Sequence, residues 1–251
     1  MKDIVVVIMA GGLGKRMQSS IPKVIHKVAG IPMLCHILLK LKILSNMVTI
    51  NKILIVVGKY KDVIKEELEK YDSLPKFEFI FQEKSLGTGH AIQCCRSKLL
   101  AYQESDVLIL SGDVPMLQTI TMYKLLAIKN EVKMLTTFLK EPTGYGRIVE
   151  NDGKFEKIVE QKDCSKEQLK INKVNCGIYA INSDNLCKYL PYLNNNNSQK
   201  EYYLTDIIEI IKREEKIDVG MMNISEENAI EIIGVNTIEQ LKELDKLILH
   251  R

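Results

Sequence analysis

The sequence has no tryptophan, and its 251 residues include only 6 prolines and 6 cysteines. No two cysteines form a C-x-x-C pair, the spacing typical of zinc ribbons and thioredoxin-type redox motifs, so neither kind of site is expected. We expect free thiols, buried in a reducing compartment. The cysteines are Cys35, Cys94, Cys95, Cys164, Cys176 and Cys187.

Long apolar runs and a large charge of one sign are also missing. No run approaches the ~20 residues that span a bilayer, and the apolar start at 4–10 follows a Lys-Asp pair, a poor secretory signal. Lysine and arginine number 35 and aspartate and glutamate 32, a formal net charge of +3. This near-balance, without interleaved aromatic and basic residues, gives no basis for nucleic-acid binding. We expect a cytoplasmic protein that binds no membrane.

Short apolar strands alternate with amphipathic helices through the first part of the chain. The β-branched run at 4–10 ends in two glycines and is typical of a strand buried on both faces of a parallel sheet. The alternation predicts an α/β fold with a doubly wound, mostly parallel sheet. Strands are expected over 4–10, 52–57, 77–81, 107–110 and 133–139, and helices over 32–44, 62–71, 89–101 and 116–130.

The pattern changes to paired strands after residue 141. Segments 146–150 and 154–160 flank Asn151-Asp152-Gly153, a strong β-hairpin signal, and 175–181 is a further expected strand. Helices are expected over 203–212 and 237–249. We expect one domain over 1–251, made of a core (1–141), a small β-rich lobe (142–182), and closing helices with a late strand (183–251).

The most informative segment follows the first expected strand. Residues 10–17 read AGGLGKRM, and Lys23 follows Pro22 soon afterwards. Three glycines in four positions let backbone N–H groups turn towards phosphate oxygens. Arg16 can hold two such oxygens through its planar guanidinium, and Lys23 adds a mobile point charge. The spacing fits neither a Walker loop nor a dinucleotide fingerprint. The alternative is a plain glycine turn with basic residues on the surface.

Nine short motifs occur in the order in which the UDP-N-acetylglucosamine pyrophosphorylase family has them. They are AGGLGKRM, PKVIHKVAG, QEKSLGTGHA, SGDVPM, GYGRIV, IVEQKD, VNCGIY, EYYLTDII and GVN. From residue 5 to about 244 the chain resembles the uridylyltransferase half of the bifunctional bacterial enzyme. The resemblance implies a nucleotide-diphospho-sugar transferase fold, Rossmann-like, in which 1–141 binds the nucleotide and the 142–182 lobe binds the sugar. Since no hexapeptide repeat is present, we expect uridylyl transfer without the acetyltransferase β-helix.

The resemblance implies transfer of UMP from UTP to N-acetylglucosamine 1-phosphate, with Arg16 and Lys23 as catalytic cations. It implies Mg²⁺ on Asp113 and Asn236, which suits an ion that takes one or two protein oxygens together with phosphate oxygens and water. It implies nucleotide contacts at Met9, Ala10, Gly11, Gly12, Gly14, Gln82, Gly87 and Thr88, and sugar contacts at Gly112, Gly146, Glu160, Asn175 and Thr205.

The residue chemistry suits these roles and also permits plainer ones. An amide and a hydroxyl can bind the edge of a pyrimidine, and a carboxylate can accept from sugar hydroxyls. However, Thr88 could cap a helix, Asp113 could form a turn, and Glu160 could lie on a solvated strand face. His90 is expected to be structural. The chain departs from the family at Ser111, where Tyr is usual, and at Cys176, where Thr is usual.

Two other functions stay open. One is a sister enzyme that uses glucose 1-phosphate or a thymidine nucleotide, and the other is a non-catalytic nucleotide-sugar-binding module. The motifs at 86–89 and 174–177 favour the N-acetyl sugar. The presence of Arg16, Lys23 and Asp113 favours an enzyme. The oligomeric state cannot be carried over, because the family's trimer forms through the β-helix.

Overall fold

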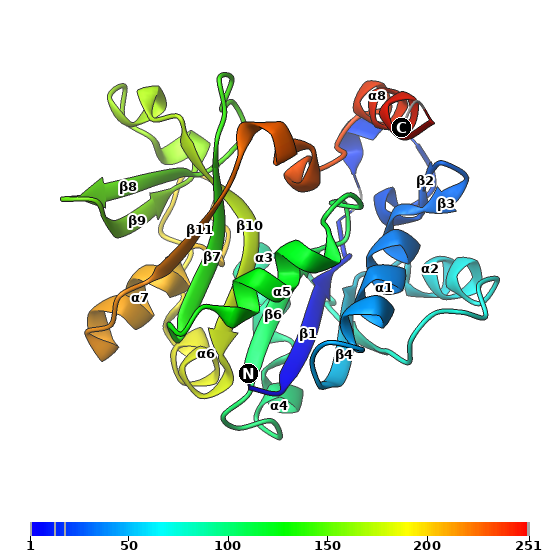
Figure 1. Cartoon of the computed structure of the whole chain (residues 1–251), viewed down its shortest axis with the longest axis horizontal. Helices are drawn as coiled ribbons and strands as arrows, with labels where there is room; N and C mark the ends of the chain where they lie inside the picture. The colour runs from blue at the N-terminus through cyan, green and yellow to red at the C-terminus, as the bar shows by residue number, and fades with distance from the viewer. Residues whose placement is uncertain (1, 13, 18, 250–251) are drawn as a thin grey trace.

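The computed structural model describes residues 2–12, 14–17 and 19–249. In this part of the chain the centre is a nine-stranded sheet, with seven strands in the order β11-β7-β10-β6-β1-β4-β5 (Figure 1). β1 is parallel to β4 and β6, whereas β10 is antiparallel to β6 and β7. The bounds are β1 Ile4–Met9, β4 Ile50–Val57, β5 Glu78–Phe81, β6 Asp106–Ser111, β7 Val132–Phe138, β10 Lys173–Asn182 and β11 Gly220–Ile224.

Helices cover both faces of this sheet. Because successive residues of a strand point to opposite faces, Val6 belongs to one apolar core and Val7 to the other. The first core contains α1 (Met33–Leu44), α2 (Lys61–Leu68) and α5 (Thr119–Ala127). The second contains α3 (Thr88–Gln93), α4 (Arg96–Leu99), α6 (Ser183–Tyr189) and α7 (Asp206–Glu215). The predicted doubly wound, mostly parallel α/β fold is confirmed.

Two local predictions were wrong. The helix expected over 89–101 is split into α3 and α4, and the one expected over 116–130 begins only at Thr119, after an extended Gln118. Helix α6 was not expected at all. It begins after Asn182, whose side chain accepts hydrogen bonds from the N–H groups of Asp184 and Asn185 and so caps the helix. This cap was the available sequence signal.

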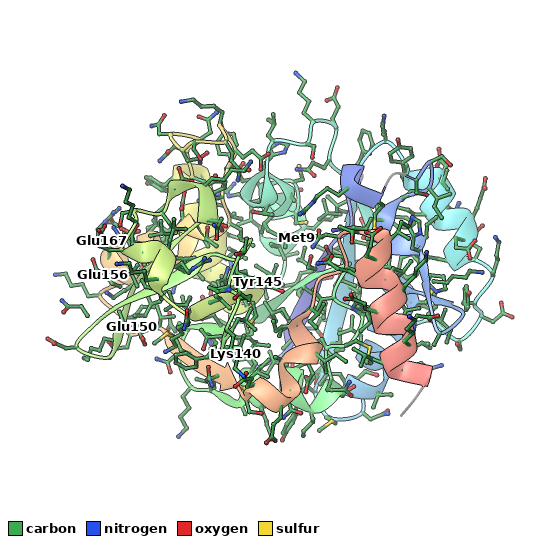
Figure 2. All side chains as sticks on the ribbon, turned by 90° about the horizontal axis from the view of Figure 1, so that it is seen from above. Met9, Lys140, Tyr145, Glu150, Glu156 and Glu167 are labelled. Atoms are coloured by element: carbon green, nitrogen blue, oxygen red, sulfur yellow. The ribbon has the colours of Figure 1, made fainter. Side chains whose placement is uncertain are left out.

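The lobe is built on the expected hairpin, β8 (Arg147–Asn151) with β9 (Lys154–Val159). Its last strand, β10, is shared with the main sheet, because Val174 pairs with Arg147 of β8 while the end of β10 pairs with β6. Residue 182 therefore ends a strand that runs through both parts. Figure 2 shows Glu150 and Glu156 on the outer side of the lobe, and Tyr145 on its inner side towards Met9.

The C-terminal helix α8 (Ile238–Leu249) contributes Leu244 to a third apolar core, together with Met17, Val28, Met33 and Val235. This core connects the glycine-rich segment to the C-terminal part of the chain. The remaining elements are β2 Lys27–Val28, β3 Ile31–Pro32 and the 3-10 helices η1 Lys15–Met17, η2 Lys23–Ile25, η3 Gln161–Asp163, η4 Gln168–Lys170, η5 Leu190–Tyr192 and η6 Glu226–Ile232. Among the described residues, no helix has both the length and the apolar character needed to cross a membrane.

Candidate active site

Two adjoining cavities, of about 320 Å³ and 290 Å³, lie at the carboxyl ends of β1 and β6. Met9, Thr88, Ser111 and Asp113 line both, so the cavities are two halves of one site. Ligands of open α/β sheets bind at this end of the strands. We call the 320 Å³ cavity the lobe half; it is lined also by Arg16, Gly146, Glu160, Asn175, Thr205 and Asn236. We call the 290 Å³ cavity the loop half; it is lined also by Gly11, Gly12, Lys23, Gln82 and Gly87.

The glycine-rich segment forms one wall of the loop half. Gly14 has φ +61°, and a Cβ on it would lie 2.8 Å from the Cβ of Lys23, so only glycine fits there. A Cβ on Gly11 would lie 3.2 Å from Oε1 of Gln82. Ala10 is buried and, like Gly14, lies outside both cavity linings. Leu13 of the motif lies outside the described residues.

The two basic residues meet two side-chain oxygens at the boundary between the halves. Lys23 lies on η2 and forms an ion pair with Oδ2 of Asp113, and its Nζ donates to Oδ1 of Asn236 at 3.0 Å. Arg16 lies on η1 and donates to the same Asn236 oxygen at 3.2 Å. Four residues from four separate segments therefore converge on one point.

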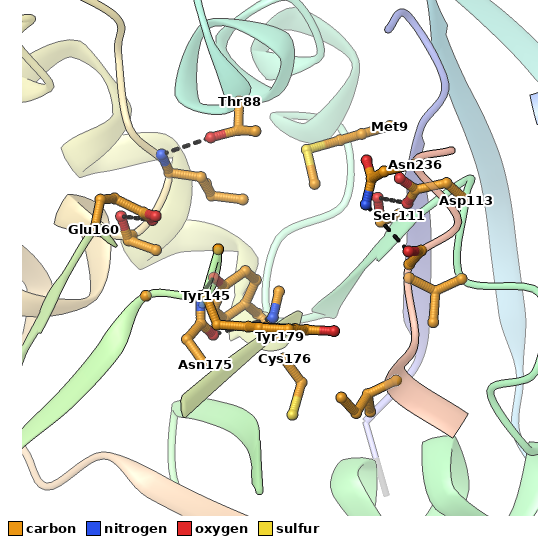
Figure 3. Close-up of a pocket in the computed structure, with 18 of the residues that line it drawn as sticks. Met9, Thr88, Ser111, Asp113, Tyr145, Glu160, Asn175, Cys176, Tyr179 and Asn236 are labelled. Atoms are coloured by element: carbon orange, nitrogen blue, oxygen red, sulfur yellow. Dashed lines mark hydrogen bonds between the residues drawn. The ribbon is translucent and has the colours of Figure 1, made fainter. Parts of the chain in front are cut away.

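Asp113 sits in a turn and also presents an oxygen to the site. The hydroxyl of Ser111 donates to Oδ1 of Asp113 at 2.6 Å, which leaves Oδ2 for Lys23. Figure 3 shows Ser111, Asp113 and Asn236 together on one side of the cavity. Gly112 lies outside both linings. A Cβ on it would be 3.0 Å from the carbonyl oxygen of Met9, so this glycine lets the ends of β1 and β6 approach.

Oδ2 of Asp113 and Oδ1 of Asn236, which we call the oxygen pair, both contact the ammonium of Lys23 and so already converge on a cation. The described residues contain no cluster of three or more His, Cys, Asp or Glu suited to a metal. One carboxylate and one amide oxygen fit a hard divalent cation that completes its ligands with phosphate oxygens and water. The oxygen pair therefore fits a divalent metal held jointly with substrate.

The residues expected to bind the base meet in the loop half. Nε2 of Gln82 donates to the carbonyl of Gly87 at 3.3 Å and contacts Nδ1 of His90 at 3.0 Å, which gives His90 a structural contact. Gly87 has φ +112°, and a Cβ there would lie 2.6 Å from the carbonyl oxygen of Tyr202. The reading of Thr88 as a helix cap was wrong: Gly87 occupies the N-cap, and the Thr88 hydroxyl accepts from the N–H of Leu204 at 3.1 Å.

The lobe half collects the residues expected to bind the sugar. Glu160 lines this cavity and accepts from the hydroxyl of Thr205 at 3.1 Å, so it does not lie on a solvated strand face. A Cβ on Gly146 would lie 3.5 Å from both carboxylate oxygens of Glu160. Asn175 donates to the hydroxyl of Tyr179 at 2.6 Å and accepts from the N–H of Gly177 at 3.1 Å, where the pairing of β10 is irregular.

Negative charge gathers behind the lobe half. Burial raises the pKa of Glu160, although the hydrogen bond from Thr205 acts in the opposite direction. Asp206, in the first turn of α7, has its pKa raised to about 6, first by burial and then by the carboxylates of Glu209, Glu160 and Asp163. The folded protein therefore binds a proton at Asp206 more tightly than the unfolded chain does.

Asp206→Asn tests this charge through the pH dependence of stability. A raised pKa means that stability is lost as pH rises from the ordinary value of 3.8 through about 6. Asn does not titrate, so we expect the free energy of unfolding of the variant to rise relative to that of the wild type over this pH range. The difference should be about 1 kcal/mol at pH 7 after allowing for solvent screening. That is roughly 2–4 °C in Tm. The exposed Asp62→Asn, in the first turn of α2, is the control. Parallel pH profiles for wild type and Asp206→Asn would contradict the assignment.

Sequence reasoning missed several residues that line the lobe half. Tyr145, Cys176 and Tyr179 stand inside quoted motifs without an assigned role. Gln240 had a clear signal, because Thr237-x-x-Gln240 is a capping box at the start of α8. Gln240 Oε1 accepts from the N–H of Thr237 at 3.2 Å and from that of Asn236 at 2.7 Å. The cap of α8 thus holds the backbone that carries Asn236.

Comparisons with known proteins agree that the chain is similar to nucleotidyltransferases. The family model described as "Nucleotidyl transferase" matches residues 5–227. The chain is 40% identical to a protein of Acanthamoeba polyphaga mimivirus named "Probable UDP-N-acetylglucosamine pyrophosphorylase", over 96% of this chain and 95% of that protein. It is 39% identical to the bifunctional protein GlmU of Clostridium tetani, over 98% of this chain but 52% of that protein. It therefore spans about half the length of that bifunctional relative.

Solved structures show the same fold at lower sequence identity. A structure from Bacillus anthracis assigned as a glucose-1-phosphate thymidylyltransferase has a TM-score of 0.74 and 21% identity, and covers 97% of this chain and 94% of its own. HddC from Yersinia pseudotuberculosis, complexed with GMP-PN, has a TM-score of 0.67 and 18% identity, and the match covers 99% of this chain and 100% of HddC. The resemblance drawn from the motifs is confirmed, and the chain belongs to the nucleotidyl transferase family.

Proposed function

We propose that this chain transfers UMP from UTP to N-acetylglucosamine 1-phosphate, giving UDP-N-acetylglucosamine and pyrophosphate. The observation that carries the proposal is the two-part cavity, whose halves meet at Ser111 and Asp113 beside two cations. Members of the family bind nucleoside triphosphates and sugar phosphates. The name of the viral relative, a probable UDP-N-acetylglucosamine pyrophosphorylase, supports the uridine nucleotide and the N-acetylated sugar as the particular pair.

The reaction needs positioning more than proton transfer. A phosphate oxygen of the sugar 1-phosphate attacks the α-phosphorus of UTP, the bond to the β-phosphate oxygen breaks, and pyrophosphate leaves in line. The nucleophile is already an anion, so no general base is required. Catalysis then depends on holding two anions together and on balancing charge as it develops. The shared wall of the two halves, which includes Met9, Ser111 and Asp113, is where the reacting phosphates would meet.

Each half supplies groups of the right kind for one substrate. In the loop half, the backbone at Gly11 and Gly12 lies where a triphosphate would be cradled, and Gln82 with Gly87 lies where the edge of uracil would be bound. In the lobe half, Glu160 and Asn175 offer acceptors and a donor for sugar hydroxyls and the acetamido group.

The family generally uses a divalent metal, and we propose that it is Mg²⁺ here. The oxygen pair would hold it. When bound, the ion supplies positive charge to the phosphate oxygens and orients them. Lys23, which now contacts both oxygens of the pair, would then turn its ammonium to the phosphates. Arg16 would do the same from η1, so the two basic residues change partners from Asn236 to the substrate.

A pyrophosphate-release assay tests the function directly. The chain is incubated with Mg²⁺, one of UTP or dTTP, and one of N-acetylglucosamine 1-phosphate, glucosamine 1-phosphate or glucose 1-phosphate. We expect the highest kcat/KM for UTP with the N-acetylated sugar. A preference for dTTP or for glucose 1-phosphate would establish the sister enzyme instead. Nucleotide binding without pyrophosphate release for any pair would establish the binding module.

Gly146→Ala should separate the two substrates. The added Cβ would lie 2.9 Å from Cγ2 of Ile158 and would narrow the space in front of the Glu160 carboxylate. Because the added methyl group takes space from the sugar phosphate, we expect KM for this substrate to rise about tenfold or more, which corresponds to about 1.4 kcal/mol of lost binding, with KM for UTP nearly unchanged. Gly12→Ala is the matched variant in the loop half, where the new Cβ meets no atom within 4 Å. Equal changes in both KM values for Gly146→Ala would count against a sugar site in the lobe half.

A further inference from the structure

The two segments that carry the oxygen pair run side by side. The N–H of Val235 donates to the carbonyl oxygen of Asp113 at 2.9 Å, directly beside the pair. A second connection lies five residues from each member of the pair, between Glu231 and Gln118. Figure 1 shows the segment after β11, which contains Glu231, close to the loop that precedes α5. The two segments are therefore joined at two points, by the hydrogen bond from Val235 and by the carboxylate of Glu231.

The Glu231 carboxylate is buried, and one of its oxygens accepts two hydrogen bonds from the start of α5. The residue is 8% exposed, and its Oε2 accepts from the N–H of Gln118 at 3.1 Å and from the hydroxyl of Thr121 at 2.6 Å. Gln118 is the N-cap of α5, and its own side chain makes no capping hydrogen bond. A carboxylate that accepts from the N-cap N–H does what the acidic residue of a capping box does, and it also suits the positive end of the helix dipole. Here it comes from a segment more than a hundred residues away.

Lys40 secures the same junction from α1. Its Nζ donates to the carbonyl oxygen of Pro115, two residues after Asp113, at 2.6 Å. Burial lowers the pKa of Lys40 to about 8, and the nearby negative charge of Glu231 acts in the opposite direction. The Asp113 loop is thus held by α1 on one side and by Glu231 on the other. Of these two attachments, the one made by Glu231 comes from the segment that carries Asn236.

We infer that Glu231 is a positioning residue of the metal site, whose carboxylate fixes the segment bearing Asn236 against the loop bearing Asp113. The inference rests on the proposed metal role of the oxygen pair. Mg²⁺ requires nearly ideal octahedral geometry, so its affinity is sensitive to the separation of its protein oxygens. Without Glu231, the two segments keep the Val235 hydrogen bond but lose the distant attachment that prevents them from pivoting about it.

The test measures metal binding without turnover. Mn²⁺ is titrated into the chain in the presence of saturating UDP-N-acetylglucosamine, and free Mn²⁺ is read by electron paramagnetic resonance. The variants are Glu231→Ala, Glu231→Gln and Glu231→Asp. Gln keeps an acceptor of the same reach, whereas Asp keeps the charge but is too short to reach Gln118. Glu226→Ala, on the same 3-10 helix but exposed, is the matched control. UTP binding in EDTA is measured for every variant.

We expect the Mn²⁺ dissociation constant to rise about tenfold or more for Glu231→Ala and Glu231→Asp, less for Glu231→Gln, and not for Glu226→Ala, by analogy with groups that orient metal ligands. UTP binding in EDTA should stay within about twofold. Unchanged Mn²⁺ affinity in folded Glu231→Ala, or an equal loss of metal-free UTP binding, would overturn the inference, because the role would then be general stability. Failure of the proposed function would appear separately, as a wild-type chain that releases no pyrophosphate.

Discussion

Asp113→Ala is expected to abolish metal-dependent turnover, with kcat/KM falling at least about 10³-fold. The variant removes one member of the oxygen pair and the counter-ion of Lys23. A metal left with Asn236 alone would lose its charged protein ligand. The freed Lys23 ammonium could then bind phosphate without metal, which would favour ground-state binding over reaction. A loss of 10³ corresponds to about 4 kcal/mol of transition-state stabilisation.

Two companion variants make this result interpretable. Asp113→Asn keeps an acceptor for the Ser111 hydroxyl and removes only the charge, so it should fold like the wild type and still lose most activity. Asp218→Ala, an exposed aspartate far along the chain, should leave kcat/KM unchanged. The measurement is pyrophosphate release as a function of Mg²⁺ concentration. Retention of more than about a tenth of wild-type kcat/KM by Asp113→Ala would remove Asp113 from the metal role.

Local sequence signals predicted the framework of the fold because each depends on neighbouring residues. The continuous apolar run of β1 indicated a central parallel strand, and Asn151-Asp152-Gly153 indicated the β8–β9 turn, where Asp152 and Gly153 have φ +49° and +72°. The placement of β10 was not predictable in this way. Its antiparallel position between β6 and β7 depends on pairing with strands that lie much earlier in the sequence.

In the candidate site, too, the sequence indicated residue types but not their long-range contacts. The residue types at Lys23 and Asp113 suggested charge chemistry, and the resemblance assigned them roles, but neither could show that Lys23 contacts Asp113 and Asn236 at once. Thr88 illustrates the limit most clearly. Its residue type allowed a cap for its own helix, whereas its hydroxyl accepts from the N–H of Leu204, 116 residues away. Contacts at such separation are set by tertiary packing, which no local pattern encodes.

Arg16→Ala is expected to lower kcat/KM by about 10²–10³, the usual cost of removing one charge-stabilising group from an active site. Arg16 is exposed and its one side-chain hydrogen bond among the described residues goes to Asn236, so the substitution should leave the free energy of unfolding nearly unchanged. The loss would therefore report on phosphate charge and not on the fold. Arg213→Ala, an exposed arginine of α7, is the matched control and should behave as the wild type.

Arg16→Lys distinguishes charge from shape. An ammonium keeps the positive charge but cannot hold two phosphate oxygens in one plane as a guanidinium does. If Arg16 holds the departing pyrophosphate by two oxygens, Arg16→Lys should lie close to Arg16→Ala in kcat, while KM for UTP recovers. If Arg16 acts only as a point charge beside Lys23, both kcat and KM for UTP of Arg16→Lys should recover towards the wild-type values. Near-normal turnover of Arg16→Ala itself would exclude the residue from catalysis and leave Lys23 as the cation at the boundary of the two halves.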